Sequence, residues 1–439
     1  MTGTLGRVAV IGAGSSGLTA AKNFRAAGFA VEVLEREDDL GGNWNYGKSG
    51  ARVYRSTHTI SSKPGTEYPD FPMPREFPDY PHHSQILSYL RDYARQFDLL
   101  PLIRFNTSVD RVAPSAEGQA DSAWEITLAG GERRRFDLVV VANGHHWFPK
   151  QPGYPGGFTG LSLHSADYRT PEIFDGERVL VVGGGNSGCD IVVEAAQNGA
   201  HAWHSTRRGY WYLPKYLLGK PADQVADQML ALGAPLWLRR ASATLMHRLL
   251  VGSPARIGLP RPDHRLFETH PIVNSLLPYY VGQGDITPKP DITRVDDRRV
   301  HFVDGTAAEV DVIVWATGYL IRFPFLEERH LNWQDGRPRL YLNLFHPTYD
   351  TFFMAGLIQP DSGQFGLVHW QTVAAARFAR AVRAGSPSAT ALRERKANPW
   401  DDLGNGIRYR DSTRHYLEVE HWSYRKKLRR WAERMPIDD

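Results

Sequence analysis

Residues 158–188 read FTGLSLHSADYRTPEIFDGERVLVVGGGNSG, and the second half of this stretch decides the fold. An apolar, strand-like run at residues 179–182 leads into the turn GGGNSG at residues 183–188, which has the G-x-G-x-x-G spacing and precedes a helix. In such a turn the first glycine permits the tight bend, the second lets the backbone approach a pyrophosphate, and the third lets the helix pack on the strand. The stretch therefore predicts a dinucleotide-binding domain.

A second turn of the same kind, GAGSSG at residues 12–17, lies near the N-terminus. A short apolar strand at residues 7–11 precedes it, and a helix and then a strand at residues 31–34 follow it. That strand ends at Glu35, where an acid can accept hydrogen bonds from ribose hydroxyls. Two complete strand, turn and helix units predict that the protein binds two dinucleotides.

Bulk properties exclude several other classes of protein. A chain of 439 residues suggests two or three domains, and its net charge of +4 is small for this length. The one basic run, RKKLRR at residues 425–430, is interpreted as a solvated helix face, so no nucleic-acid partner is expected. Cys189 is the only cysteine, which excludes the thiol–disulfide reductases. No long apolar span, signal peptide or metal-binding pattern is found, so we expect a cytoplasmic enzyme without a transmembrane anchor or a metal.

Two buried strands, each followed by small residues, suggest where one domain interrupts the other. They lie at residues 136–142 and 310–319. We predict an α/β protein with two Rossmann-like domains, the second inserted into the first. Residues 1–160 and 310–439 would form the first domain and the C-terminal helices, and residues 161–309 the insertion. A helical subregion near residues 219–280 is interpreted as a packed hairpin, a lid over a substrate tunnel or a membrane-surface contact.

The residues after each second strand indicate which dinucleotide binds where. In the inserted domain the strand at residues 200–204 is followed by Ser205, Thr206, Arg207 and Arg208, with no acid. Hydroxyl donors and guanidinium groups suit a 2′-phosphate, which predicts a preference for NADPH over NADH of roughly ten- to a hundredfold. The alternative is two surface arginines in a loop. In the first domain, Gly42 and Trp44 belong to a loop that can lie against a flat ligand, which favours a flavin.

The pattern Phe158-x-Gly160-x-x-x-His164-x-x-x-Tyr168-Arg169-x-Pro171 resembles the fingerprint of the flavin-containing monooxygenases. The segments at residues 53–63, 70–72, 316–319 and 356–360 also resemble that family, so the resemblance covers nearly the whole chain. The aromatic residue Tyr168 separates the sequence from the Baeyer–Villiger branch, whose fingerprint has tryptophan at this position.

The resemblance implies an oxygenase with FAD and NADPH as cofactors. NADPH would reduce the flavin, O₂ would add to give a C4a-hydroperoxyflavin, and one oxygen atom would pass to a nitrogen or sulfur of a small organic substrate. It places FAD at Gly12, Gly14, Ser16, Gly17, Glu35, Gly42, Trp44, Val109, Gly318 and Gln359. It places NADP at Tyr168, Gly183, Gly185, Asn186, Ser187, Gly188, Ser205, Thr206, Arg207 and Arg208.

One position departs from the family's pattern. Aligning Tyr54, Ser56 and Lys63 with the family puts Ile60 where an asparagine usually lies near the reactive flavin position. In an extended segment residues i and i−2 face the same side, so we expect His58 to take the polar, catalytic role. The alternative is a solvated or packing histidine.

Four functions remain to be compared. The first is oxygenation of nitrogen or sulfur, and the second is Baeyer–Villiger oxygenation of ketones, which Ile60 keeps open. The third is an NAD(P)H reductase or oxidase without oxygen transfer, and the fourth is a nucleotide sensor without chemistry. The sequence leaves the physiological substrate undefined, and a homodimer is compatible with it.

Overall fold

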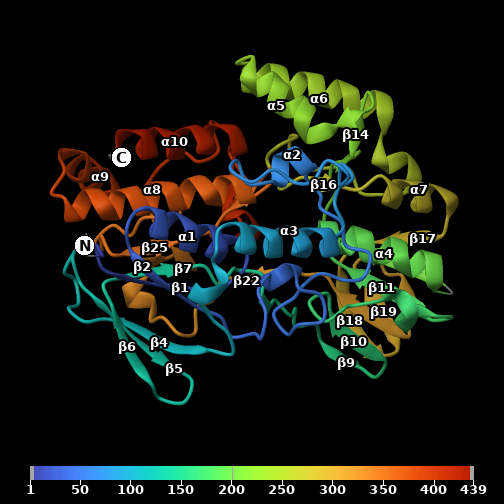
Figure 1. Cartoon of the computed structure of the whole chain (residues 1–439). Coiled ribbons are helices and arrows are strands. Elements are labelled where there is room, and N and C mark those ends of the chain that lie inside the picture. The colour runs from blue at the N-terminus through green and yellow to red at the C-terminus, as the bar shows by residue number, and fades with distance from the viewer. Residues whose placement is uncertain (1–3, 200, 436–439) are drawn as a thin grey trace.

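Two parallel sheets form the frame of the molecule (Figure 1), a computed structural model that describes residues 4–199 and 201–435. The first sheet has the order β25-β7-β1-β2-β3 and the second the order β10-β21-β11-β12-β17. Strands of the first sheet are β1 (Arg7–Ile11), β2 (Ala30–Leu34), β3 (Ile103–Arg104), β7 (Leu138–Val141) and β25 (Phe352–Met354). Those of the second are β10 (Leu161–His164), β11 (Arg178–Val182), β12 (His201–Ser205), β17 (Ile286–Lys289) and β21 (Val312–Trp315).

Both sheets have the character of Rossmann-type sheets. All their pairings are parallel, and the interior strands β7 and β21 are buried along their whole length. Strands that are buried on both faces have continuous apolar sequences, and both β7 and β21 show this pattern. Helix α1 (Ser15–Ala26) connects β1 to β2, and α4 (Asn186–Asn198) connects β11 to β12. The predicted fold class, with two dinucleotide-binding domains, is confirmed.

The second boundary of the insertion differs from the prediction. Strand β21 pairs with β10 and β11, so it belongs to the second sheet and does not return the chain to the first. The chain rejoins the first sheet at β25, which pairs with β7. The prediction that the first domain resumes at residue 310 is therefore wrong for this strand. An apolar run followed by small residues indicates a buried strand, but its hydrogen-bonding partner decides to which sheet it belongs.

Two further sheets, one antiparallel and one mixed, flank the parallel ones. One consists of β4 (Val109–Pro114), β5 (Trp124–Leu128) and β6 (Arg133–Phe136). The other consists of β9 (Gly156–Phe158), β18 (Ile292–Asp297), β19 (Arg299–Phe302) and β20 (Ala307–Glu309), with β9 parallel to β18. Short pairs are β8 (Phe148–Pro149) with β22 (Tyr319–Leu320), β13 (Tyr212–Leu213) with β16 (Ile272–Val273), β14 (Tyr216–Leu217) with β15 (Lys220–Pro221), β23 (Trp333–Gln334) with β24 (Arg337–Pro338), and β26 (Gln359–Pro360) with β27 (Glu418–Val419).

The remaining helices cover the sheets and form the helical subregion. They are α2 (Lys63–Thr66), α3 (His83–Gln96), α5 (Ala222–Ala231), α6 (Leu236–Leu250), α7 (Leu276–Gln283), α8 (Phe365–Arg383), α9 (Pro387–Ala397) and α10 (His421–Arg434). Helices α5 and α6 are separated by a turn containing Gly233, whose φ is +72°, and Pro235. Among the residues described, no helix combines the length and the apolar character needed to cross a membrane.

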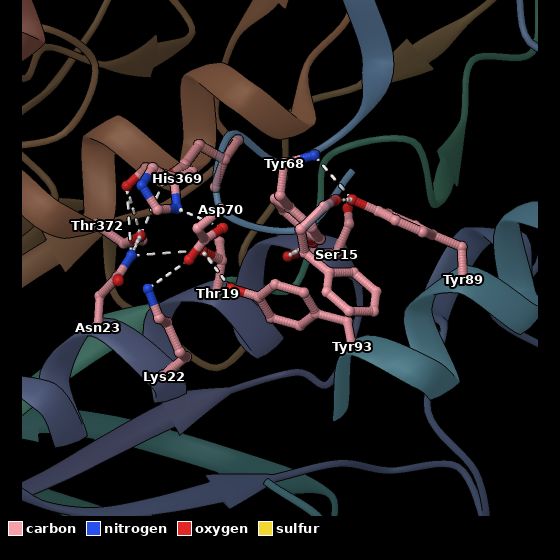
Figure 2. Close-up of polar contacts among 12 residues, drawn as sticks. Ser15, Thr19, Lys22, Asn23, Tyr68, Asp70, Tyr89, Tyr93, His369 and Thr372 are labelled. Carbon is pink, nitrogen blue, oxygen red and sulfur yellow. Dashed lines mark hydrogen bonds and ion pairs between the residues drawn. The ribbon is translucent and has the colours of Figure 1, made fainter. Parts of the chain in front are cut away.

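A polar network fixes α1, the helix that follows the first glycine turn, against α8 and a loop (Figure 2). Lys22 and His369 both contact the carboxylate of Asp70, and the Asn23 amide donates to Thr372 Oγ1 at 2.8 Å. The Tyr68 hydroxyl donates to the carbonyl oxygen of Ser15 at 2.6 Å. These contacts reach the first turn of α1 and so hold the glycine turn in a fixed position.

Candidate functional site

Both glycine turns open into one cavity of about 1030 Å³. Strands β1 and β11 each end at this cavity, which agrees with the rule that parallel sheets bind ligands at the carboxyl ends of their strands. Gly12 and residues 14–16 of the first turn and residues 183–187 of the second contribute to its wall. The two predicted dinucleotide sites are therefore halves of a single site, which allows their ligands to meet.

In the first turn each glycine has a different task. Gly12 has a φ of +101°, which side chains rarely adopt. A Cβ on Gly17 would lie 1.8 Å from the Gly12 carbonyl oxygen, so α1 could not pack this closely on the turn. At Gly14 the nearest atom to a Cβ is 3.8 Å away, so the absent side chain leaves space open for a ligand. Within the described residues no side chain caps α1, which leaves its N-terminal N–H groups available to a phosphate.

Glu35 is fixed at the cavity wall, directly after the end of β2. Its Oε2 accepts a hydrogen bond from the Ala13 N–H at 2.6 Å, and its Oε1 accepts one from the Glu37 N–H at 2.9 Å. Burial raises the pKa of this carboxyl, and the two backbone donors oppose that rise. Each oxygen retains a lone pair, so the side chain can still accept hydrogen bonds from the hydroxyls of a ribose.

The other residues assigned to the first cofactor mostly line the same cavity. Gly42 approaches the glycine turn so closely that a Cβ would lie 3.1 Å from the Gly14 Cα, and Trp44 packs edge-on against Phe365. Of the ten assigned residues, all but Gly17 are part of the wall: Gly12, Gly14, Ser16, Glu35, Gly42, Trp44, Val109, Gly318 and Gln359. Gly17 lies behind the wall, where the absence of a side chain lets α1 pack closely on the turn.

The second turn repeats this geometry. Gly183 has a φ of +125°, and a Cβ on Gly188 would lie 1.9 Å from the Gly183 carbonyl oxygen. Asn186 uses its side chain elsewhere, because its amide donates to the Pro271 carbonyl and accepts from the Val273 N–H. Helix α4 therefore also begins without a side-chain cap from the described part of the chain. Gly183, Gly185, Asn186 and Ser187 line the cavity, and Gly188 lies behind it.

Some of the residues at the end of β12 and after it are placed where they could bind a phosphate, and others are not. Arg207 and Arg208 are exposed and line the cavity, and within the described chain neither forms an ion pair. Ser205 also lines it, although its hydroxyl donates to the Pro290 carbonyl at 2.7 Å. Thr206 is buried and its side chain is outside the wall, so it does not join the cluster that the sequence predicted.

Tyr168 and His164 have structural positions in the segment before β11. Tyr168 is fully buried behind α4, where its hydroxyl donates to the Glu194 carboxylate, so the assignment of Tyr168 to the NADP site is not supported. His164 Nε2 donates to the Gly318 carbonyl at 3.1 Å and its Nδ1 accepts from the Ala166 N–H. Burial lowers the pKa of His164, which favours this neutral form. The imidazole thus attaches the segment to the turn after β21.

The structure does not bring His58 to the cavity. Its side chain is exposed, its Nδ1 donates to the Ser56 carbonyl at 2.8 Å, and its ring lies beside His82. The segment is not a regular strand, so the alternation that placed His58 beside Ile60 does not hold. Three consecutive residues, Thr59, Ile60 and Ser61, line the cavity instead. Thr59 is buried, and its Oγ1 finds no hydrogen-bond partner within the described chain.

One cationic residue of the cavity was missed by the sequence analysis. Arg414, in the short 3-10 helix Thr413–His415 before β27, lies over the Tyr210 ring at 5.3 Å. Its Nη2 is 3.7 Å from the point where a Gly185 Cβ would be, directly over the second glycine turn. A guanidinium group at this place can bind a pyrophosphate held by the turn. No spacing in the sequence connects Arg414 to Gly185, so only the fold reveals the pair.

Comparison with known proteins agrees with this geometry. Residues 5–419 match the family described as FMO-like, flavin-binding monooxygenase-like. The chain is 35% identical over 397 residues to dimethylaniline monooxygenase [N-oxide-forming] 2 of Oryctolagus cuniculus, covering 86% of this chain and 73% of that protein. In fold it resembles S-allyl-L-cysteine S-oxygenase of Allium sativum, with a TM-score of 0.67, 22% identity and coverage of 98% and 88% of the two chains. It also resembles cyclohexanone monooxygenase, with a TM-score of 0.69, 19% identity and coverage of 98% of each chain.

The residues at the cavity fit two dinucleotides, since two uncapped helix N-termini, two close glycine turns and one acid that can accept hydrogen bonds from a ribose meet there. The sequence match covers nearly the whole chain. The chain therefore belongs to the flavin-binding monooxygenase-like family, and it is a monooxygenase that depends on FAD, NADPH and O₂.

Proposed function

We propose that the enzyme transfers one oxygen atom from O₂ to a nitrogen or sulfur atom of a small organic substrate. The observation that carries this proposal is the single cavity lined by both glycine turns, in which a hydride donor and its acceptor can lie together. The balance is one NADPH, one proton, one O₂ and one substrate converted to NADP⁺, water and oxygenated substrate. The N-oxide-forming relative supports a soft nucleophile as the acceptor of oxygen.

We assign the first turn, with Glu35, Gly42 and Trp44, to FAD, and the second turn, with Arg207, Arg208 and Arg414, to NADPH. FAD supplies the redox chemistry that activates O₂. The chain supplies binding and orientation. His164 attaches the segment between the two domains to the turn at Gly318. This contact helps to hold the nicotinamide and flavin halves of the cavity in a fixed position relative to each other. We also propose that the enzyme is cytoplasmic. We further propose that the chain consists of a first nucleotide-binding domain into which the second is inserted.

The test of this function is product analysis with an amine, a thioether and a ketone, with NADPH consumption followed in parallel. We expect an N-oxide or S-oxide in near-stoichiometric ratio to NADPH, and little ester from the ketone. Ester as the main product would identify Baeyer–Villiger oxygenation, which Ile60 in the cavity wall keeps as the second candidate. NADPH consumption with hydrogen peroxide as the only product would identify an oxidase and contradict the proposal.

Replacing Arg208 with glutamine is expected to weaken NADPH binding roughly tenfold and leave NADH binding within about twofold. The reason is that one charged hydrogen bond to the 2′-phosphate contributes on the order of 1.5 kcal/mol, and NADH has no such phosphate. The measurement is KM for each nucleotide in flavin reduction. A matched control is Arg133→Gln, an exposed arginine on β6 that is not part of the cavity wall. An equal loss for NADPH and NADH would contradict the assignment.

Thr59, and not His58, is expected to support oxygen transfer. A buried hydroxyl without a protein partner needs a ligand to satisfy it, and Thr59 lines the cavity beside Ile60. Thr59→Val keeps the shape and removes the donor, so we expect peroxide release per NADPH to rise roughly five- to tenfold, as for one lost hydrogen bond. His58→Ala is the control and should leave the ratio of product to peroxide unchanged. The reverse result would restore His58 to the catalytic site.

A further inference from the structure

The edge strand β17 brings a carboxylate, that of Asp291, to the wall of the dinucleotide cavity. Asp291 follows the end of β17 by two residues and lines the cavity. Strand β17 is parallel to β12, with Lys289 opposite Ser205, so both strands end at the same edge of the second sheet. Asp291 therefore lies next to the residues after β12, to which we assign the 2′-phosphate of NADPH.

The order of the strands indicates which part of NADPH reaches Asp291. Strand β11 ends at the second glycine turn, where the pyrophosphate binds, and its neighbour β12 ends at Ser205, just before Arg207 and Arg208. The next strand in the sheet is β17. The adenine is joined to the ribose that carries the 2′-phosphate, so it extends from the end of β12 away from the pyrophosphate. Asp291 is thus placed at the adenine end of the site.

The Asp291 carboxylate is held firmly but keeps a free acceptor. Its Oδ1 accepts hydrogen bonds from the Tyr154 hydroxyl at 2.7 Å and from the Ile292 N–H at 3.0 Å. Its Oδ2 forms no hydrogen bond or ion pair within the described chain. The basic residue closest in sequence, Lys289, donates to the Thr306 hydroxyl instead, at 2.9 Å. A group in the cavity with an N–H to donate can therefore bind at Oδ2.

Tyr154 gives the same part of the wall a flat surface. It also lines the cavity, and its ring stacks on that of Trp315 with the centroids 5.9 Å apart and the planes at 22°. Burial and the contact with Asp291 raise the pKa of the Tyr154 hydroxyl to about 12, and the charge of Arg207 nearby opposes this rise. An aromatic ring and a guanidinium group both offer flat faces to a purine base.

We propose that Asp291 recognises the adenine of NADPH by accepting a hydrogen bond from its exocyclic amine at Oδ2, a role that rests on the proposed assignment of the second glycine turn to NADPH. Adenine presents a donor, N6–H₂, where hypoxanthine presents a carbonyl oxygen. An ionised carboxylate only accepts hydrogen bonds, so it favours the amine over the carbonyl. Asp291 thus selects the base, whereas Arg207 and Arg208 select the phosphate.

Binding of two dinucleotides to the oxidised, FAD-loaded full chain tests this role. The probes are NADP⁺ and nicotinamide hypoxanthine dinucleotide phosphate, and calorimetry gives Kd for each. We expect the unsubstituted protein to prefer NADP⁺ roughly tenfold, as for one charged hydrogen bond. Asp291→Asn should reduce the preference to within about twofold, because an amide can accept from the amine or donate to the carbonyl. Tyr154→Phe removes a donor that orients Asp291 and should reduce the preference to roughly threefold.

Two variants provide matched controls. Asp285 is exposed, precedes β17 at the opposite end of that strand and is not part of the cavity wall. Asp285→Asn makes the same change of charge and should leave both affinities unchanged. Arg208→Gln should weaken the binding of both dinucleotides, since both carry the 2′-phosphate, and should keep the preference for adenine near roughly tenfold.

Several results would contradict the role of Asp291. Equal affinity of the unsubstituted protein for the two dinucleotides would overturn it. So would an equal change for both in Asp291→Asn, since the carboxylate would then face the ribose or the phosphate. A failure of the NADPH assignment itself differs from these, because Arg208→Gln would then leave NADP⁺ binding unchanged. Since binding is measured without turnover, the result is independent of which substrate is oxygenated.

Discussion

Gly188→Ala is expected to give a yellow, FAD-loaded protein whose flavin NADPH no longer reduces at a measurable rate. The new Cβ would lie 1.9 Å from the Gly183 carbonyl oxygen and within 3.3 Å of the Ala316 Cβ, so α4 must move away from β11. Overpacking of this kind costs roughly 3 kcal/mol, and the movement displaces the N–H groups that face the pyrophosphate. We therefore expect NADPH to bind at least about a hundredfold more weakly. The measurements are the flavin absorbance of the purified protein and stopped-flow reduction.

The reciprocal variant Gly17→Ala should lose FAD and become colourless, because its Cβ would lie 1.8 Å from the Gly12 carbonyl oxygen. Gly157→Ala is a suitable control, since a Cβ there meets no atom within 4 Å. Circular dichroism should show that both variants remain folded. If Gly188→Ala lost FAD while Gly17→Ala kept it, the assignment of the two turns to the two cofactors would be reversed.

These two substitutions depend on the part of the protein that was most predictable from sequence. A glycine turn is a local structure, because its six residues contain both the strained backbone and the close helix contact that require glycine. The same holds for Glu35, which lies at the end of the strand that follows the helix. Of its two backbone donors, Glu37 is two residues away, and Ala13 belongs to the glycine turn of the same strand, helix and strand unit.

Features that depend on distant contacts were less predictable. Strand β21 has the apolar pattern of a buried strand, but its partners β10 and β11 place it in the second sheet. Arg414 reaches Gly185 only because the segment before β27 folds over the second turn. The prediction for His58 was wrong for another reason, because it required an extended segment and the chain there is irregular. Periodicity identifies a face only where the secondary structure is regular.

The free energy of unfolding is expected to fall steeply as the pH drops from about 6.5 to 4. Burial lowers the pKa of His204 and His421 to about 4 and the pKa of His346 to about 3. In this range the unfolded chain binds protons on these imidazoles, whose ordinary pKa is about 6.5, while the folded protein keeps them neutral. Each histidine then lowers stability by up to about 1.4 kcal/mol per pH unit as the pH falls. Above pH 6.5 both states are neutral and this contribution is fully present.

Asp361 acts in the opposite direction. Burial raises its pKa to about 7, so the folded protein holds a proton on Asp361 that the unfolded chain releases above about pH 4. Among these four groups, three histidines opposed by one aspartate contribute a net loss of up to about 4 minus 1.4, or roughly 3 kcal/mol per pH unit. Urea unfolding at pH 6.5, 5.5 and 4.5 with constant ionic strength measures the slope.

Two substitutions separate the opposing groups. His346 Nδ1 accepts hydrogen bonds from the Thr348 and Tyr349 N–H groups, and asparagine can replace that acceptor without titrating. His346→Asn should therefore flatten the slope by up to about 1.4 kcal/mol per pH unit. Asp361→Asn keeps the acceptor for the His421 N–H and should steepen the slope by a similar amount. Because the two changes move the slope in opposite directions, a general loss of stability cannot imitate both. A slope that neither substitution alters would show that these groups do not control acid unfolding.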